Sequence, residues 1–257
     1  MQDRYIGDIG DFGKFGLLRA LIGCHPVNEQ VLHLGIVWYA FHPEDLKTEE
    51  AKKDGKHVSY LENDYRKLAV CDPDLYKKLG DIISSNQRQI SSISKANLFA
   101  SKPVFYDRPL SNKNIPLENR SMSRKEWFVA ALNETRSCQI VFLDPDNGIA
   151  SNKKNERLQD APKYVFLEEV GEFVQRGQSL VIYHHLGRHI PHKDQLTEQF
   201  QRLRSKIPRG YDLHTLSYHR GTARAFYLAF EQSHRNLLTK RLKTFLQSPW
   251  KAHFQKR

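Results

Sequence analysis

The sequence predicts an α/β fold, an αβα sandwich whose mostly parallel sheet ends in an antiparallel hairpin. Segments 139–145 and 179–185 are β-branched, apolar runs, and each is followed by a loop and an amphipathic helix. Such βα units are typical of a parallel sheet that is covered by helices on both faces. Near the C-terminus, 211–219 and 222–230 have the composition of two strands joined by Arg-Gly, which indicates a hairpin.

The remaining elements follow from hydrophobic spacing and capping signals. In segment 12–23, Phe15, Leu18, Leu21 and Ile22 recur at helical spacing. The glycines at 7, 10, 13 and 16 indicate close approach of backbone or ligand. We expect further strands at 31–41, 89–94 and 104–106, and further helices at 72–86, from Ser123 (an N-cap with Glu126 three residues later), at 163–177, at 193–207 and at 236–250.

A chain of 257 residues with 39% hydrophobic content is long enough for one large domain with a packed core. We therefore expect a single domain over 1–257. Segment 42–125 is polar and interrupted by proline in places, which predicts an insertion or irregular segment within it. Segment 181–257 is the basic C-terminal part of the same domain.

The net charge of +11 is placed unevenly along the chain. Residues 181–257 contain 15 Lys/Arg and 4 Asp/Glu, which accounts for the whole excess, and they hold eight of the twelve histidines. This asymmetry favours a polyanionic partner, and nucleic acid, RNA or DNA, is the commonest one. The alternative is a solvated basic surface that only keeps the protein soluble.

Cysteine usage and hydropathy indicate in which cellular compartment the protein is expected. The three cysteines, Cys24, Cys71 and Cys138, show no CxxC pairing, which argues against a disulfide framework and fits a reducing cytosol. No run approaches the roughly 18 to 20 apolar residues that span a bilayer, and the N-terminus lacks the pattern of a signal peptide. We expect a cytoplasmic protein with no membrane partner.

The stretch Asp144-Pro145-Asp146-Asn147-Gly148 directly follows the most apolar strand. It has the residues of a rigid turn, which needs no function. Ligands in open parallel sheets, however, bind at the carboxyl ends of strands, and Asp144 ends one strand there. Asp144, Pro145, Asp146 and Asn147 are therefore candidate catalytic residues.

The next strand ends in His184 and His185, which we add to the candidate catalytic residues and expect opposite Asp144. The segment that follows holds Arg188, a candidate phosphate contact, together with His189 and His192. Its histidine spacing matches no specific zinc signature. An exposed basic loop is the competing interpretation.

Other charged residues give weaker signals. Arg220 and Arg224 flank the last turn and are candidate nucleic-acid contacts, although ordinary surface charge explains them equally well. Glu168, Glu169 and Glu172 are expected on a solvated helix face. A P-loop, a GxSxG elbow, an HExxH motif and a GxGxxG motif after the first strand are all absent from the sequence.

The layout resembles the class I S-adenosylmethionine-dependent methyltransferases, whose Rossmann-like sheet ends in an antiparallel hairpin. Amino-methylating members carry Asp/Asn-Pro-Pro-Tyr/Phe at the end of the fourth strand, where this chain has Asp144-Pro145. The closest layout is that of the large-subunit rRNA adenine-N6 methyltransferases. These open with a Gly/Asn–Asp–Lys cluster before the first strand, and "GDIGDFGKFG" at 7–16 is similar. The bacterial three-Cys-motif partner proteins share a related plan.

The resemblance implies S-adenosylmethionine as cofactor, with Asp11, Lys14 and Gly35 in its pocket and Asp144 holding the target amine. Glu44 or Asp45 would bind the ribose. The sequence departs from the family at Asp146-Asn147-Gly148, which replace the second proline and the aromatic residue. It departs again after the first strand, where the glycine-rich loop is missing and Gly35 lies inside the strand. An aromatic surface for the base would then come from Tyr183.

Three functions remain open from the sequence. The first is an enzyme with a methyltransferase-like fold that transfers a methyl group to a base amine of nucleic acid. The second is a metal-dependent nuclease or phosphoesterase, in which Asp144 and Asp146 would hold Mg²⁺ and His184, His185 or Arg188 would contact phosphate. The third is a non-catalytic nucleic-acid-binding or bacterial defence protein that retains a degenerate methyltransferase fold.

Overall fold

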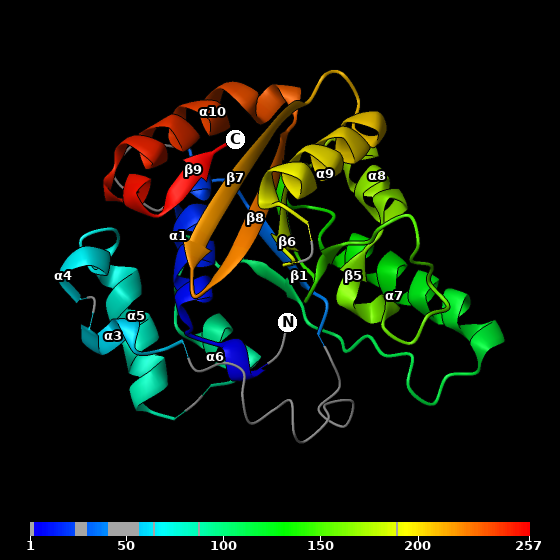
Figure 1. The fold of residues 1–257 in the computed structure, drawn as a ribbon, viewed down its shortest axis with the longest axis horizontal. Coiled ribbons are helices and arrows are strands. Elements are labelled where there is room, and N and C mark those ends of the chain that lie inside the picture. Colours follow the sequence, from blue (N-terminus) through cyan, green and yellow to red (C-terminus); the bar gives the residue numbers. More distant parts are fainter. Residues whose placement is uncertain (1–2, 24–29, 41–56, 64, 87, 189) are drawn as a thin grey trace.

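The computed structural model describes residues 3–23, 30–40, 57–63, 65–86, 88–188 and 190–257 (Figure 1). Its centre is a seven-stranded sheet with the order β2-β1-β3-β6-β8-β7-β9. The first four strands in this order are parallel, and β8 runs antiparallel to both β6 and β7. The strands are β1 (Leu34–Trp38), β2 (Val104–Tyr106), β3 (Ile140–Asp144), β6 (Ser179–His185), β7 (Asp212–Arg220), β8 (Thr222–Phe230) and β9 (Phe254–Lys256). The predicted α/β sandwich with an antiparallel end is confirmed.

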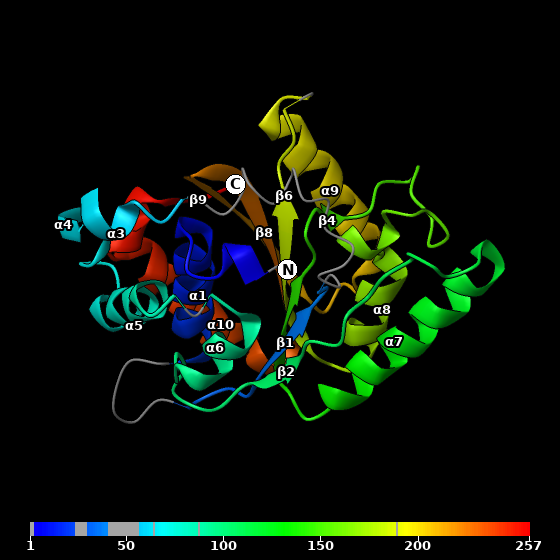
Figure 2. The same cartoon turned by 90° about the horizontal axis from the view of Figure 1, so that it is seen from below.

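Helices cover both faces of this sheet, as Figure 2 shows edge-on. One face carries α1 (Ile9–Ile22), α5 (Pro73–Ser84), α6 (Ile90–Lys95) and α10 (Gln232–Gln247). The other carries α7 (Arg120–Glu134), α8 (Leu167–Gln175) and α9 (His192–Lys206). Strand residues alternate between the two resulting cores, because successive side chains point to opposite faces. Ile36 and Trp38 lie in the α1 core, whereas Val37 and Tyr39 lie in the α7–α8 core.

The N-terminal helix α1 is capped at both ends and is buried along nearly its whole length. The Asp8 carboxylate accepts a hydrogen bond from the Asp11 amide, and Gly23 ends the helix with φ of 92°. A Cβ at Gly10, Gly13 or Gly16 would lie within 2.6 Å of Arg224, Tyr218 or Trp250, respectively. These glycines therefore let the hairpin and the C-terminal segment pack onto the helix, and this face binds side chains of the chain itself.

The polar segment before β3 is more regular than expected. Its described part contains α3 (Tyr60–Asn63), α4 (Tyr65–Leu68), α5, α6, β2 and the 3₁₀ turn Leu117–Asn119. β2 belongs to the central sheet and α5 packs on α1, whereas 107–116 forms neither helix nor strand. Residues 41–56 lie outside the described part of the chain.

Two local predictions in this region fail. Segment 89–94 forms the helix α6 and not a strand, because Ile90 and Ile93 are three residues apart and bury one helix face. Ser123 is not an N-cap, since α7 begins three residues earlier at Arg120. The helix at 72–86 is confirmed as α5, with Asp72 as its N-cap.

The stretch after β3 is no simple reversal. It continues into β4 (Gly148–Ile149), which pairs in parallel with β5 (Tyr164–Val165) in a separate two-stranded sheet. β4 also packs against β6. The chain thus folds over the carboxyl ends of the central strands. Among the described residues, no helix is both long and apolar enough to cross a membrane.

Candidate active site at the carboxyl edge of the sheet

Asp144, the last residue of β3, points to the α1 face and binds Lys14. The Lys14 Nζ atom lies 2.8 Å from Asp144 Oδ2 and 2.9 Å from Asp11 Oδ1. All three side chains are buried, with relative exposures of 5% or less. The structure thus brings together two residues that are 130 positions apart, and both were candidate site residues from the sequence.

One ammonium between two carboxylates gives this cluster an excess negative charge. Burial raises the pKa of Asp11 to about 6, although Lys14 acts in the opposite direction. Burial alone would lower the pKa of Lys14, but the adjacent Asp11 and Asp144 outweigh it and raise that pKa well above its usual value. Lys14 is therefore a permanent cation at the centre of the cluster.

A second layer of polar groups surrounds the cluster. Lys14 Nζ lies 5.8 Å from the Tyr183 ring centroid, and Tyr183 lies against Arg224 of β8. Arg224 is only 6% exposed, donates to the Arg220 carbonyl oxygen at 3.0 Å, and lies 4.0 Å from the Asp8 carboxylate. The expected surface position of Arg224 is wrong, because its guanidinium packs inside the fold on α1.

Trp38 adds an unsatisfied donor at the same edge. It ends β1 and is the register partner of Asp144. Its side chain is fully buried and stacks on Phe105 with ring centroids 5.0 Å apart. The indole N–H finds no hydrogen-bond partner within the described residues. A buried donor without a partner is costly, and a ligand with an acceptor atom would relieve that cost.

His184 points away from Asp144, to the opposite face of the sheet. Its ring lies 5.9 Å from Tyr227 in the α7–α8 core, whereas Asp144 shares its face with Phe142 and Tyr183. The His184 Nδ1 atom accepts a hydrogen bond from the Ile149 amide at 3.0 Å. The expected joint cleft of Asp144 and His184 is therefore wrong, and His184 secures β4.

Gly148 shows how tightly this loop lies on His184. Its φ is +103°, and a Cβ there would lie 2.4 Å from His184 Nδ1 and 2.6 Å from the His184 Cα atom. Only glycine fits at this point between the loop after β3 and strand β6. The glycine of the Asp-Pro-Asp-Asn-Gly stretch is thus explained by packing.

The buried imidazole of His184 makes stability depend on pH. Burial, His185 and Arg202 lower the pKa of His184 to about 4 from 6.5. The unfolded chain therefore binds a proton between pH 6.5 and 4 that the folded chain rejects, and stability falls as pH falls through this window. Because of His184, we expect the free energy of unfolding to be about 2 kcal/mol lower at pH 5 than at pH 7.

Urea denaturation of wild type and His184→Asn at both pH values measures this loss. The asparagine Oδ1 takes the place of Nδ1 as acceptor for Ile149, so the variant keeps the bond and removes the titration. From pH 7 to pH 5, the free energy of unfolding of wild type should fall by about 2 kcal/mol more than that of His184→Asn. Equal losses in the two proteins would contradict a neutral, buried His184.

The remaining candidates spread along the carboxyl edge. His185 and Arg188 are exposed, and His185 is the register partner of Arg224, on the Asp144 side of the sheet. Arg220 is half-buried and donates from Nε to His253 Nδ1 at 2.9 Å. Residue 189 lies outside the described part of the chain.

The residues after Asp144 shape the loop. Pro145 is buried, whereas Asp146 and Asn147 are half-buried. The Asn147 backbone donates to the Lys163 carbonyl at 2.9 Å and accepts from the His185 amide at 3.3 Å, which fixes the loop between β5 and β6.

Gly35 does not contribute to this edge. It is the second residue of β1, and a Cβ there would lie 2.9 Å from the Thr135 side chain and 3.1 Å from Cys138 Sγ. Its predicted place in a cofactor pocket is wrong, because it packs at the amino end of the strand. Glu44 and Asp45 lie outside the described residues. Asp107, which the sequence analysis missed, directly follows β2 and is exposed.

The arrangement does not fit the predicted Mg²⁺ ligands. Asp144 and Asp146 would have to face one ion, but the Lys14 ammonium already neutralises the Asp144 carboxylate at 2.8 Å. A bound cation there would lie against a second positive charge. Among the described residues, no three His, Cys, Asp or Glu side chains lie close enough to hold a metal ion.

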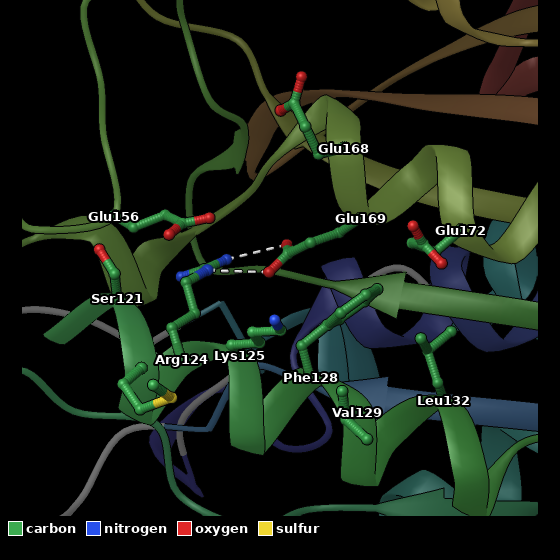
Figure 3. A pocket seen from close by; sticks show the side chains of 11 residues that line it. Ser121, Arg124, Lys125, Phe128, Val129, Leu132, Glu156, Glu168, Glu169 and Glu172 are labelled. Atoms are coloured by element: carbon green, nitrogen blue, oxygen red, sulfur yellow. Dashed lines mark hydrogen bonds and ion pairs between the residues drawn. The ribbon is translucent and has the colours of Figure 1, made fainter. Parts of the chain in front are cut away.

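A buried ion pair on the other face was also missed. Glu169 of α8 is 5% exposed and pairs with Arg124 of α7, with Nε–Oε1 at 2.8 Å and a second bond at 2.9 Å (Figure 3). The Tyr39 hydroxyl also donates to Glu169. The prediction of a solvated face holds for Glu168 and Glu172 and is wrong for Glu169.

A cavity of about 470 Å³ opens beside this ion pair, between α7 and α8. It lies on the other side of the sheet from the Lys14–Asp144 contact, because α7 and α8 cover the face opposite α1. Buried ionisable clusters and strand ends are the better guide to a reaction site here. We therefore place the candidate active site at Asp144 and treat the α7–α8 cavity separately.

Comparison of the chain with protein-family models, curated proteins and solved structures gives no match in any of the three.

Proposed function

We propose that this chain is a methyltransferase-like enzyme that acts on nucleic acid, with Asp144 as the acceptor for a base amine. The observation that carries the proposal is the buried contact between Lys14 and Asp144 at 2.8 Å. The two residues come from the two segments in which the sequence resembles amino-methylating enzymes. Their contact at the carboxyl end of a central strand is where an α/β sheet binds ligands.

Asp144 would orient the amine without taking part in covalent chemistry. Lys14 binds Oδ2, while Oδ1 has no hydrogen-bond donor among the described residues. An exocyclic N–H could donate to Oδ1, which aligns the nitrogen lone pair with the incoming methyl group. Lys14 holds the carboxylate in place through the 2.8 Å contact with its ammonium group. The chain's own contribution is thus orientation in a buried site.

Donors and acceptors at the same edge suit an adenosine-bearing cofactor. The unpaired Trp38 N–H can donate to a ring nitrogen or oxygen, and Asp107 at the end of β2 offers a carboxylate to ribose hydroxyls. S-adenosylmethionine bound there would supply an electrophilic methyl group. Asp11 would contribute through Lys14, which it holds at 2.9 Å.

Nucleic acid would approach from the exposed side of this edge. His185 and Arg188 are exposed beside the β6 end, and they provide hydrogen-bond donors and positive charge for phosphate. Arg220 is half-buried nearby, whereas Arg224 is buried and packs inside the fold. We expect binding to weaken steeply as salt rises, because phosphate contacts release counterions.

Calorimetric titration and thermal melts with S-adenosylhomocysteine test the proposal. A ligand that binds only the folded state at 100 times its Kd stabilises it by about 2.7 kcal/mol. Binding should also change the fluorescence of Trp38, and Trp38→Phe should lose that change while Trp127→Phe keeps it. Trp127 is the matched control because its N–H already donates to the Arg108 carbonyl at 2.8 Å.

The catalytic part is tested with Asp144→Asn. We expect it to retain cofactor binding and to lose about 100-fold or more in methyl transfer to RNA or DNA, since the amide no longer offers a carboxylate to the amine. Asp160→Asn, which removes a carboxylate paired with Lys154 outside this cluster, should change neither quantity. No stabilisation by S-adenosylhomocysteine in the wild type would refute the proposal. Nucleic-acid binding without cofactor binding would indicate a non-catalytic binding protein.

A further inference from the structure

The cavity between α7 and α8 is a groove with an apolar floor, an acidic wall on the α8 side and the exposed Lys125 on the α7 side (Figure 3). Phe128 and Leu132 of α7 are buried in its floor, and Phe128 packs edge-on against Phe173 of α8 at 5.7 Å. The Arg124–Glu169 ion pair joins the two helices at one end. These contacts fix the two walls, so the groove exists before any partner binds.

Apolar side chains are exposed along the same helix. Met122 is 61% exposed and Val129 is 44% exposed, and both line the groove. Leu117, 56% exposed, precedes α7 by one turn. These three are half of the six exposed large hydrophobic side chains of the described chain, within 13 consecutive positions. Such a concentration is typical of an interaction surface.

Three further carboxylates surround the groove on a protein with a net charge of +11. Glu168 and Glu172 are exposed on α8 and lie one helical turn apart. Glu168 reaches Lys206 only through a solvent-exposed pair at 3.3 Å, and Glu156 and Glu172 form no ion pair within the described residues. These charges repel phosphate and attract cationic side chains.

We propose that this groove docks a basic amphipathic helix of a partner protein. Apolar side chains of that helix would fill the trough over Phe128 and Leu132 beside the exposed Val129. Lysine or arginine residues one turn apart would meet Glu168 and Glu172, because residues at i and i+4 are about 6 Å apart on both helices. A helix in a groove anchored at i, i+4 and i+7 is a recurring mode of recognition.

The test uses the full chain and a fluorescein-labelled peptide of about 15 residues with leucine at helical spacing and lysine elsewhere. Fluorescence anisotropy should show saturable binding that weakens with salt. Glu168→Gln with Glu172→Gln should weaken binding about tenfold, which corresponds to about 1.4 kcal/mol. Val129→Asp should weaken it by a similar factor. Glu118→Gln with Glu126→Gln, exposed acids outside the groove lining, should not.

Charge reversal separates this groove from non-specific attraction. Glu168→Lys with Glu172→Lys should lose the lysine peptide and gain a peptide in which glutamate replaces lysine. Circular dichroism checks that each variant is folded. Absence of saturable binding, equal weakening in the Glu118/Glu126 control, or failure of the reversed pair would each overturn the proposal. Self-association in sedimentation that Val129→Asp abolishes would also overturn it, because a second copy would then be the occupant.

Discussion

Lys14→Met should destabilise the fold by about 3–5 kcal/mol, the cost of leaving buried charges without their partner. Lys14 is the only cation within 3 Å of Asp11 and of Asp144 among the described residues, and both carboxylates are nearly inaccessible to water. Methionine fills the same volume, so the loss reports charge and not a cavity. Urea denaturation at pH 8 measures the difference in the free energy of unfolding.

The same variant should recover part of its stability at pH 5. The pKa of Asp11 is already raised to about 6 in the wild type, chiefly by burial, and it rises further without Lys14. A carboxyl group whose folded pKa exceeds its unfolded pKa favours the folded chain as pH falls through the folded value. Protonation of Asp11 therefore removes one of the two uncompensated charges.

Lys206→Met is the matched control, because Lys206 pairs with Glu168 at 3.3 Å on an exposed surface. Its cost should stay below about 1 kcal/mol and should not depend on pH in this way. If Lys14→Met were as stable as Lys206→Met, the buried cluster and the proposal built on Asp144 would both lose their physical basis. If Lys14→Met still binds S-adenosylhomocysteine, Lys14 is needed for the stability of the fold and not for cofactor binding.

The sequence was most informative about the apolar strands. Segments 179–185 and 222–230 coincide with β6 and β8, because continuous runs of apolar and aromatic residues fill both faces of a covered sheet. The edge strand β9 was missed, since Phe254–Lys256 is short and carries one buried residue. Short edge strands pair through the backbone and leave little pattern in the sequence.

The relative orientation of Asp144 and His184 depends on strand register, which the sequence does not encode locally. Leu143 pairs with Ile182, so Asp144 shares its face with Tyr183. A shift of one residue would have placed Asp144 beside His184 and would have produced the expected joint site. The position of Asp144 at the end of β3 was therefore predictable, whereas the side chains that surround it were not.

Arg224 is buried by contacts with residues that lie more than 200 positions away in the sequence. Its guanidinium lies over Gly10, where a Cβ would come within 2.4 Å of it, and near Asp8. Neither contact has a local signal in the sequence. Glu169, in contrast, had one. It lies at helical spacing between Phe166 and Phe173, on the apolar stripe of α8, so its burial was readable from the pattern.

Arg124→Met should cost about 3–5 kcal/mol, because it leaves the Glu169 carboxylate buried without its cation. Arg124 also donates to the carbonyl oxygens of Ala161 and Tyr164 at 3.0 and 2.7 Å. Lys125→Met is the control on the same helix, and since Lys125 is exposed its effect should stay within about 0.5 kcal/mol. Urea denaturation at pH 7 measures both.

The double variant Arg124→Met with Glu169→Met distinguishes a stabilising ion pair from a pair that is only costly to break. Replacing both charges by apolar side chains of similar size is often neutral, so the double variant should be more stable than either single variant. A double variant that loses the sum of the two single effects would show that the residues act independently.

Arg124 should also influence the loop that follows Asp144, although it lies on another helix. Its bond to Tyr164 holds the first residue of β5, β5 pairs with β4, and β4 directly follows Asp146-Asn147. Hydrogen exchange of Arg124→Met should therefore lose protection at 148–165 and keep it in α1, which packs on the opposite face of the sheet. If α1 lost protection equally, the variant would have loosened the whole fold. If only β4 and β5 opened, Arg124 would be the residue that fixes one wall of the candidate site from the far side of the sheet.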